Sequence, residues 1–200
     1  MLAPMLWVGT DILAGMLWKG YSFISQAISE LSAVGAPTRP LVAPLIVVYL
    51  VLVIAFGLGV WRYASRNRAL HVTGGLLIVS GLLGLASTPF SMHLGEAVSS
   101  PANTMHSIFA GVGVIFFLLI IGFGAVAYRN WFRFYSIGTL LTLLVAGVVS
   151  FGLAAAQGGI APPQWFGLIE RINAYGYMLW MAVLSIVLLR EEERTSTESR

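Results

Sequence analysis

The chain has 200 residues, of which 58% are apolar and 10% are charged, and its mean hydropathy is +0.88. Because a soluble protein of this size carries about 25% charged residues, the composition excludes a soluble globular protein. The chain has no cysteine, which excludes disulfides and thiolate metal sites. Its net charge of +3 comes from loop arginines, which bear on orientation in a membrane rather than on nucleic acid.

Six apolar segments follow one another along the chain, each close to the roughly 20 residues of helix that cross a bilayer core. Backbone polar groups in lipid must bond internally, so helices are expected. We predict an all-α bundle of six transmembrane helices over residues 1–190, with a disordered, charged tail at 191–200. The predicted spans are residues 2–18, 41–61, 70–88, 105–127, 135–156 and 168–189.

The start of the chain has no basic leader and no clear small-residue cleavage site, so we expect a retained first span rather than a signal peptide. Orientation follows from the basic residues, which favour the cytoplasmic side. Only Lys19, Arg39 and Arg171 lie on the predicted outer side. Both termini are therefore expected to be cytoplasmic. The arginines of the predicted cytoplasmic side are Arg62, Arg66, Arg68, Arg129, Arg133, Arg190, Arg194 and Arg200.

The segment between the first two spans, residues 19–40, is the most polar part of the chain. It contains YSFISQAISELSAVGAPTRP, with several hydroxyls, Glu30 and Arg39. Part of it, ISELSAVGAP, is expected to form a short interfacial helix that ends at Gly35 and Pro37. We expect Ile24, Ala27, Ile28 and Leu31 to face the bundle. The whole segment is predicted to close over the outer ends of spans two, four and six as a lid.

Those three outer ends are helix N-termini, which expose unpaired N–H groups and a partial positive charge. If they converge, they form a polar pocket suited to an anion. On span six, Glu170, Asn173 and Tyr177 recur at helical spacing and share one face. The alternative is that these are interface residues with solvated heads. The candidate ligand-binding residues are Glu30, Arg39, Asn103, Arg171, Asn173 and Tyr177.

His106, at the start of span four, and Glu170 are candidate catalytic residues, as the acid and base of a membrane enzyme. A lone histidine at a helix start is more often structural. Ser25, Ser29 and Ser32 invite a Ser–His–acid mechanism, but the chain has no G-x-S-x-G motif.

A metal site is the weaker alternative for the same histidines. His93 and His106, with Glu96 and Glu170, have the side chains for zinc, but their spacing matches no known ligand pattern. We therefore expect neither a metal nor a cofactor.

Asp11 lies inside the first span, between Trp7 and Trp18. An acid within a membrane span is a functional candidate, here a proton carrier. It is alternatively neutral, or bonded to Thr10 and neighbouring hydroxyls. The sequence shows no basic partner at the depth of Asp11, so both readings stay open.

Three stretches carry a resemblance: the segment YSFISQAISELSAVGAPTRP, His106 at the opening of span four, and GLIERINAYGYMLW in the last span. They resemble the prokaryotic membrane family catalogued as domain of unknown function 998. The resemblance implies a six-helix protein of the cytoplasmic membrane of bacteria or archaea, with no settled reaction. In the loop STPFSMHLGEAVSSPANT this chain departs from the proline-plus-aspartate pattern of the family and has His93 and Glu96 instead.

Three function classes remain open. The first is a protein that binds or translocates an anionic amphiphile, a lipid or a polyprenyl phosphate, with Arg39 and Arg171 on the phosphate. The second is a lipid-modifying enzyme that uses His106 and Glu170, and the third is a structural or accessory membrane subunit. Membrane lipids are the expected partners, nucleic acid is not expected, and a protein partner stays unknown.

Overall fold

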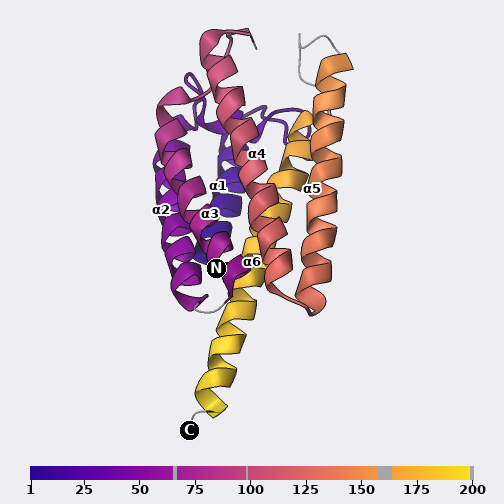
Figure 1. Ribbon diagram of the computed structural model, residues 1–200. Coiled ribbons are helices and arrows are strands. Elements are labelled where there is room, and N and C mark those ends of the chain that lie inside the picture. Colours follow the sequence, from indigo (N-terminus) through magenta and orange to yellow (C-terminus); the bar gives the residue numbers. More distant parts are fainter. Residues whose placement is uncertain (65–66, 98, 157–163, 199–200) are drawn as a thin grey trace.

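Six α-helices and two short 3-10 helices form the described part of the chain in the computed structural model (Figure 1). The structure describes residues 1–64, 67–97, 99–156 and 164–198, and of 150–156, 194–196 and 198 it describes the backbone alone. The elements are α1 (Leu2–Leu17), η1 (Ile28–Ser32), α2 (Arg39–Tyr63), α3 (Arg68–Ser87), η2 (Thr88–Phe90), α4 (Pro101–Ala127), α5 (Trp131–Ala156) and α6 (Phe166–Glu198).

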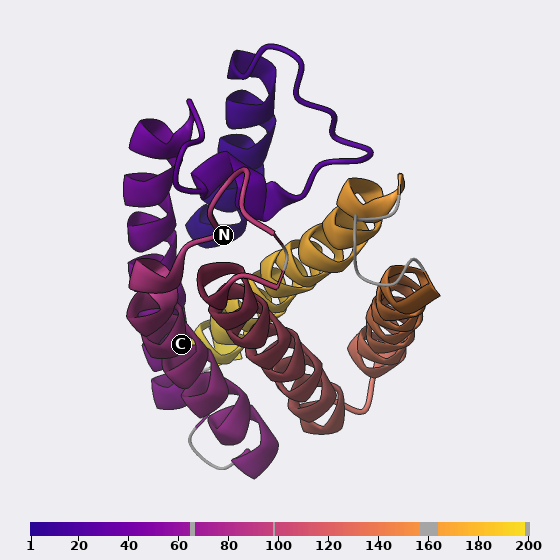
Figure 2. The same cartoon turned by 90° about the horizontal axis from the view of Figure 1, so that it is seen from above.

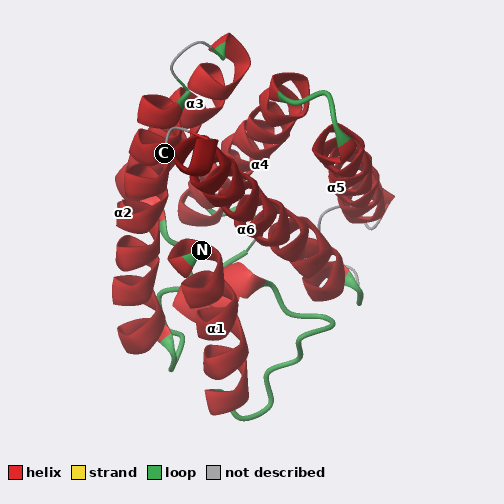
Figure 3. Ribbon diagram, turned by 90° about the horizontal axis from the view of Figure 1, so that it is seen from below, coloured by secondary structure: helices red, strands yellow, loops and turns green. Residues whose placement is uncertain are grey.

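Five of these helices, α2 to α6, are long and apolar enough to cross a membrane. The shorter apolar helix α1 has 16 residues and a length of about 24 Å, less than the roughly 30 Å of a bilayer core. No strand occurs in the described ranges, as Figure 3 shows. The prediction of an all-α membrane bundle is confirmed to this extent, with five long helices and a short first one.

Each helix packs against the next in the chain, and α6 returns to α1 and also contacts α4 (Figure 2). Glycines allow the closest approach, between α2 and α3. A Cβ atom at Gly74 would lie 2.6 Å from the backbone nitrogen of Trp61, and one at Gly57 would lie 2.9 Å from that of Ile78. Helices in lipid associate through such close packing, because lipid tails are as apolar as the side chains.

The interior of the bundle is centred on α6. Trp180, Met181 and Leu184 are fully buried, although they lie on a helix with charged residues at both ends. The indole of Trp180 donates to the Ser136 hydroxyl at 2.8 Å and covers Gly124 of α4, whose missing side chain leaves room for the ring. This packing closes α4 and α5 onto α6 in the half of the bundle away from the lid.

The arginine-rich loops meet at the end of the bundle from which α6 projects (Figure 1). Asn67 donates to the backbone carbonyl of Ala127 at 2.9 Å and so joins the two loops. The hydroxyls of Tyr63 and Tyr128 donate to Glu191 at 3.5 and 3.2 Å. Burial raises the pKa of Tyr128, which keeps this phenol in its donor form. Arg66 and Arg200 lie outside the described residues, as does the side chain of Arg194.

The tail differs from the prediction of disorder at residues 191–200, because α6 continues as a helix through Glu198. Strong helix formers, three glutamates and an arginine, follow the apolar span without a glycine or proline to end it. The tyrosine contacts to Glu191 hold the first of these residues. Residues 199–200 are not described.

At the opposite end, the connection between α1 and α2 covers the bundle. We call residues 18–38 the lid segment, which is shorter than the expected 19–40 because α2 begins at Arg39. Figure 2 shows it reaching from α1 towards the start of α6. Its backbone pairs with the loop before α4: Val34 donates to Met92 at 2.7 Å and accepts from Leu94 at 3.0 Å.

The predicted interfacial helix is present as η1, followed by Gly35 at a φ of +93°. Ala27 and Leu31 are buried as expected, whereas Ile24 is 50% exposed. The backbone of Ile24, rather than its side chain, contacts the bundle, since its carbonyl accepts a hydrogen bond from the amide of Leu168 on α6 at 3.0 Å. The lid segment is thus attached to α6 through its main chain.

Candidate functional site

Arg171 of α6 is the centre of a polar cluster beneath the lid segment. The residue is only 6% exposed, yet every N–H group of the guanidinium has an acceptor. Nε and Nη2 bind Asp11 of α1 at 3.0 and 2.9 Å in the bidentate geometry of a strong ion pair. Nη2 also donates to the Tyr21 hydroxyl at 2.7 Å. Nη1 donates to the carbonyls of Phe23 (2.8 Å), Gln26 (3.1 Å) and Gly167 (3.1 Å).

Asp11 is 3% exposed and accepts a third hydrogen bond, from the Tyr175 hydroxyl at 2.6 Å. The sequence shows no basic partner for Asp11, but the structure pairs it with Arg171, 160 residues further along the chain. The Thr10 hydroxyl, the partner considered from the sequence, donates instead to the carbonyl of Leu6 at 2.7 Å. The role of Asp11 as a proton carrier stays a prediction.

Aromatic rings complete this group, which we call the Arg171 cluster: Asp11, Tyr21, Phe23, Arg171 and Tyr175. The guanidinium carbon lies 4.8 Å from the ring centre of Phe23 and 5.6 Å from that of Tyr21, within range of cation–π attraction. Burial raises the pKa of Tyr21 to about 12, against the opposing effect of the Arg171 hydrogen bond. The neutral phenol donates to the carbonyl of Ala27 at 2.8 Å.

Close backbone contact brings the lid segment within reach of Arg171. A Cβ atom at Gly167 would overlap the carbonyl oxygen of Gln26, and one at Gly15 would overlap the Phe23 ring. Position 167 therefore requires glycine for the lid segment to pack against α6, whereas a side chain at position 15 would require the Phe23 ring to move. Sequence reasoning missed Tyr21, Gly167 and Tyr175. Tyr175 had a signal, since it follows Arg171 by four residues and shares its helix face.

The other charged candidates at this end bind the lid segment itself. Glu30 accepts from Gln26 Nε2 at 2.8 Å and from the amide of Ala27 at 2.9 Å. Arg39 is half-buried and donates through Nη1 to the carbonyl of Ser32 at 2.9 Å. Glu170 accepts from the amide of Ile28 at 2.7 Å. These contacts order the predicted lid from both sides, at the start of α2 and at the start of α6.

Asn103, in the first turn of α4, holds the loop before that helix. It is 3% exposed, accepts from the amide of His93 at 2.8 Å, and donates to the carbonyls of His93, Glu96 and Ala97 at 3.1–3.3 Å. His93 Nδ1 and Glu96 Oε1 form an exposed pair at 2.8 Å, and this hydrogen bond lowers the pKa of Glu96. The polar side-chain atoms of Asn103 are thus hydrogen-bonded to the protein backbone.

His106 is half-buried on α4, where its ring bonds to the backbone of Phe90. Within the described ranges, no hydrogen bond joins His106 to Glu170 or to His93. The described residues also contain no group of three side chains placed to hold a metal ion. Pro162 and Pro163, which introduce span six in the sequence, lie outside the described residues.

Asn173 and Tyr177 lie about one and two turns after Glu170 on α6, and they differ from the other candidates in their hydrogen bonding. Asn173 Oδ1 and the Tyr177 hydroxyl are buried and have no hydrogen-bond partner in the described structure. The Tyr177 ring, 1% exposed, stacks on Phe117 of α4, with the ring centres 3.9 Å apart and the planes at 14°. Such buried polar atoms are rare in proteins, and each calls for a partner such as water or a ligand.

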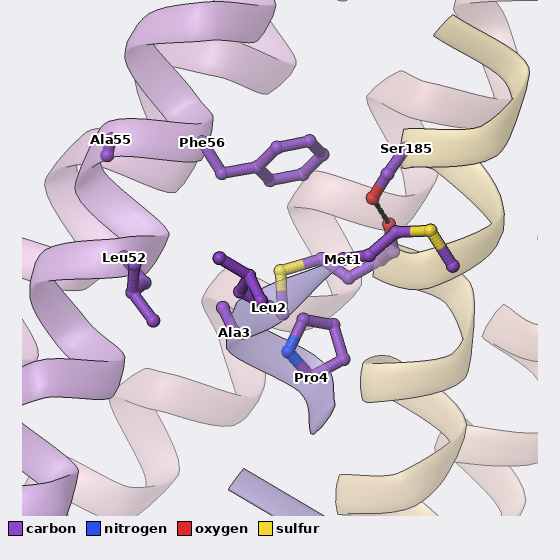
Figure 4. Close-up of a pocket in the computed structure, with 9 residues that line it drawn as sticks. Met1, Leu2, Ala3, Pro4, Leu52, Ala55, Phe56 and Ser185 are labelled. Carbon is purple, nitrogen blue, oxygen red and sulfur yellow. Dashed lines mark hydrogen bonds between the residues drawn. The ribbon is translucent and has the colours of Figure 1, made fainter. Parts of the chain in front are cut away.

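A separate cleft of about 210 Å³ lies beside the first turn of α1 (Figure 4). Its walls are almost entirely apolar, and its one hydroxyl, that of Ser185, donates to the carbonyl of Met181 at 2.8 Å. No charged side chain lines this cleft, so it offers mainly apolar contact. Its lining residues are Met1, Leu2, Ala3, Pro4, Leu52, Ala55, Phe56, Met181 and Ser185.

The fold and the polar end together define a multi-pass helical membrane protein in which the connection between α1 and α2 packs over one end of the bundle. The sequence model of a family described as protein of unknown function (DUF998) matches residues 1–187. The chain belongs to this family, which confirms the resemblance drawn from its three polar stretches. Comparison with curated proteins and with solved structures finds no match.

Proposed function

We propose that the protein binds an anionic amphiphile, a lipid or a polyprenyl phosphate, in a polar pocket beneath the lid segment. In this proposal it lies in the cytoplasmic membrane of a prokaryote, with the arginine-rich end and both termini inside and the lid end outside. The short helix α1 is then the sixth span. Its 16 residues are enough to cross the membrane if the bilayer thins locally or if polar flanking side chains extend to the interface.

The observation that carries the proposal is the pair of unpartnered polar atoms on α6, Asn173 Oδ1 and the Tyr177 hydroxyl, beneath a closed polar lid. An apolar bundle gains nothing from buried, unpaired polar groups, which cost free energy unless something bonds to them. Concave, mostly apolar sites with a few convergent polar groups are typical of small-molecule sites. A lipid supplies both parts, with a polar group at these atoms and its chains along the helices.

The two arginines of the predicted phosphate site have different roles in this proposal. Arg171 uses all its N–H groups on protein acceptors, so a phosphate there would have to displace the lid or Asp11. Arg39 lies at the start of α2, and the structure gives it one hydrogen bond, to Ser32. We therefore assign the anionic group to Arg39 and the N-terminus of α2, and the holding of the lid to Arg171.

Native mass spectrometry of the protein in mild detergent tests this assignment. Arg39→Gln removes the charge at the lid end, and Arg62→Gln removes one charge at the other end of the same helix. We expect a stoichiometric anionic lipid on the wild type and on Arg62→Gln, and its loss from Arg39→Gln. Equal retention by the two variants, or an empty wild-type protein, would contradict the proposal.

The enzyme and accessory-subunit alternatives stay predictions. The enzyme alternative needs His106 and Glu170 to act on one substrate, and their hydrogen bonds in the described structure go to Phe90 and Ile28 instead. Its test is a lipid-modifying activity whose pH–rate profile disappears in His106→Ala. Copurification of a protein partner after mild extraction tests the accessory subunit.

A further inference from the structure

The first part of the lid segment carries one exposed apolar side chain, that of Ile24. Among residues 21–33, all of which the structure describes, Ile24 alone is exposed, at 50%. Its backbone is held in place, because the carbonyl of Ile24 accepts from the amide of Leu168 at 3.0 Å. The preceding carbonyl, that of Phe23, accepts from Arg171 at 2.8 Å. The lid segment thus presents an isoleucine side chain outwards at the level of the first turns of α6.

The side chains of α6 nearest to Ile24 begin a lipid-facing stripe. Leu168, Ile172 and Leu179 recur at intervals of four and seven residues, so they share one face of the helix. They are 40%, 42% and 59% exposed, and they lie opposite the buried Tyr177. Because α6 is long and apolar enough to cross a membrane, its exposed apolar face contacts lipid chains. Leu168, the partner of Ile24, lies at the lid end of this stripe.

The depth of Leu168 follows from the charged residue at the other end of the span. Arg190 is exposed at the arginine-rich end of α6 and marks the edge of the apolar part of the helix. About 33 Å of helix separate Leu168 from Arg190, close to the roughly 30 Å of a bilayer core. Leu168 and Ile24 therefore lie at the opposite edge of the hydrocarbon layer. Trp165, 56% exposed just before α6, lies at the level where indole rings are enriched in membrane proteins.

The end of α1 is also apolar and exposed at this edge of the bundle. Met16 and Leu17 are 74% and 62% exposed, and the chain passes directly from them into the lid segment. In Figure 2 the first part of the lid segment runs along the outside of the bundle, between the end of α1 and the start of α6. Exposed apolar side chains of α1, the lid segment and α6 thus follow one another along this edge.

We propose that this part of the lid segment is a membrane contact: Ile24, with Trp165 and Leu168, inserts into the lipid leaflet at the lid end, at the boundary between headgroups and acyl chains. The contact goes beyond the proposed function, since it requires neither a bound amphiphile nor the charge of Arg39. Leaving water is favourable for an isoleucine side chain, and the Ile24 carbonyl is already paired with α6, so insertion leaves that group satisfied. The lid segment is then held by Arg171 on one side and by the bilayer on the other.

Spin labels attached to single cysteines test the contact, and the chain has no cysteine of its own that would compete for the label. Ile24→Cys reports on the proposed contact. Leu179→Cys, at the middle of the α6 stripe, is the reference for a lipid-facing position. Val34→Cys is the matched control, because Val34 is a 40% exposed aliphatic residue of the same segment whose backbone pairs with the loop before α4 instead.

The full-length labelled variants are reconstituted into vesicles of phosphatidylcholine. Power saturation then measures collisions of each label with oxygen, which concentrates in lipid, and with a water-soluble nickel chelate. We expect the label at Ile24 to collide severalfold more often with oxygen than with the chelate, as the label at Leu179 does. The label at Val34 should show the reverse. Thermal midpoints equal to that of the wild type show that the variants are folded.

A label at Ile24 that meets the chelate as often as the label at Val34 would place this part of the lid segment in water. A label shielded from both reagents would place it inside the protein, and either result overturns the inference. The outcome is separable from that of the proposed function, because the vesicles contain no anionic lipid. A lipid-exposed Ile24 without Arg39-dependent retention of anionic lipid supports the membrane contact alone, and a water-exposed Ile24 with such retention supports the proposed function alone.

Discussion

Two polar regions lie within two turns of one helix, α6, and they are organised in opposite ways. In the Arg171 cluster, every guanidinium N–H group has an acceptor, and Asp11 accepts three hydrogen bonds from side chains. In the second region, Asn173 Oδ1 and the Tyr177 hydroxyl are buried and have no partner in the described structure. A saturated cluster holds elements together, whereas an unsaturated one leaves binding capacity for something else.

The contrast extends to charge. The cluster contains a buried ion pair, whose components are expensive to separate, and it joins α1, the lid segment and α6. Asn173 and Tyr177 are neutral, so their unpaired atoms cost missing hydrogen bonds rather than an isolated charge. We infer that the Arg171 cluster contributes to stability, whereas the unpartnered polar atoms of Asn173 and Tyr177 do not. The predictions below test this division, from the largest expected effect to the smallest.

Arg171→Met should cause the largest loss of stability. It leaves the Asp11 carboxylate buried with only Tyr175 as a partner, and breaking a buried ion pair costs about 3–5 kcal/mol. The free energy of unfolding in mixed micelles measures the loss. Arg190→Met, at an exposed position on the same helix, is the control. An equal cost for the two variants would sink the stability role of the cluster.

The double variant Asp11→Leu/Arg171→Met sharpens the same measurement. Replacing both charges with apolar side chains leaves no uncompensated charge, so we expect it to recover at least half of the lost stability. Strict additivity of the single variants would instead mean that the two side chains act independently.

Gly167→Ala should release the lid segment from α6. The added Cβ atom would overlap the carbonyl oxygen of Gln26, and a forced shift of packed backbone typically costs about 1–3 kcal/mol. Hydrogen exchange at lid residues 21–32 measures the release. Gly111→Ala on α4 is the matched control, since its Cβ atom would have no neighbour within 4 Å. Equal protection of the lid in both variants would contradict the close contact.

Two Tyr→Phe substitutions should change the stability of the protein in different directions. Tyr177→Phe removes an unpartnered hydroxyl, so stability should hold or rise by up to about 1 kcal/mol. Tyr21→Phe removes a hydroxyl that accepts from Arg171 and donates to Ala27, so stability should fall by about 1–2 kcal/mol. Unfolding midpoints of the ligand-free proteins measure both. A loss in Tyr177→Phe as large as that in Tyr21→Phe would contradict the distinction between the Arg171 cluster and the two unpartnered atoms.

Alkaline pH should weaken the cluster gradually. The pKa of Tyr21 is about 12 in the folded protein and ordinarily 10.0, so folding favours the protonated phenol. Its contribution to stability is complete below pH 10 and falls as the pH rises towards 12. Thermal midpoints measured across this range should fall more steeply for the wild type than for Tyr21→Phe. Parallel curves would mean that Tyr21 does not titrate with folding.

Several expectations from the sequence agree with the structure because they rest on local patterns. The long apolar runs located α2 to α6 to within a few residues of their observed starts, since about 20 residues of apolar helix match a bilayer core. Helical spacing placed Asn173 and Tyr177 on one face. The same spacing rule identified Ala27 and Leu31 as buried but failed at Ile24, and it did not identify Ala33, Ala36 and Thr38, which are buried as well.

The candidate site was predicted as one group, and the structure divides it. Glu30, Asn103 and Arg171 share the residue types expected of a ligand site, but their side chains bind the lid segment, the loop before α4 and Asp11. Residue type does not distinguish a polar side chain that stabilises a loop from one that awaits a ligand. Only the hydrogen-bond partners, counted atom by atom, separate Arg171 from Asn173.

By itself, the sequence determined the membrane-spanning helices, the polar end of the bundle and the faces of α6, because hydropathy and the helical period act over neighbouring residues. The tertiary structure alone decided that Asp11 and Arg171 form an ion pair across 160 residues and that the Asn173 and Tyr177 polar atoms stay unpaired. Whether a side chain finds a partner on another helix depends on how the helices pack, and the local sequence does not determine that packing.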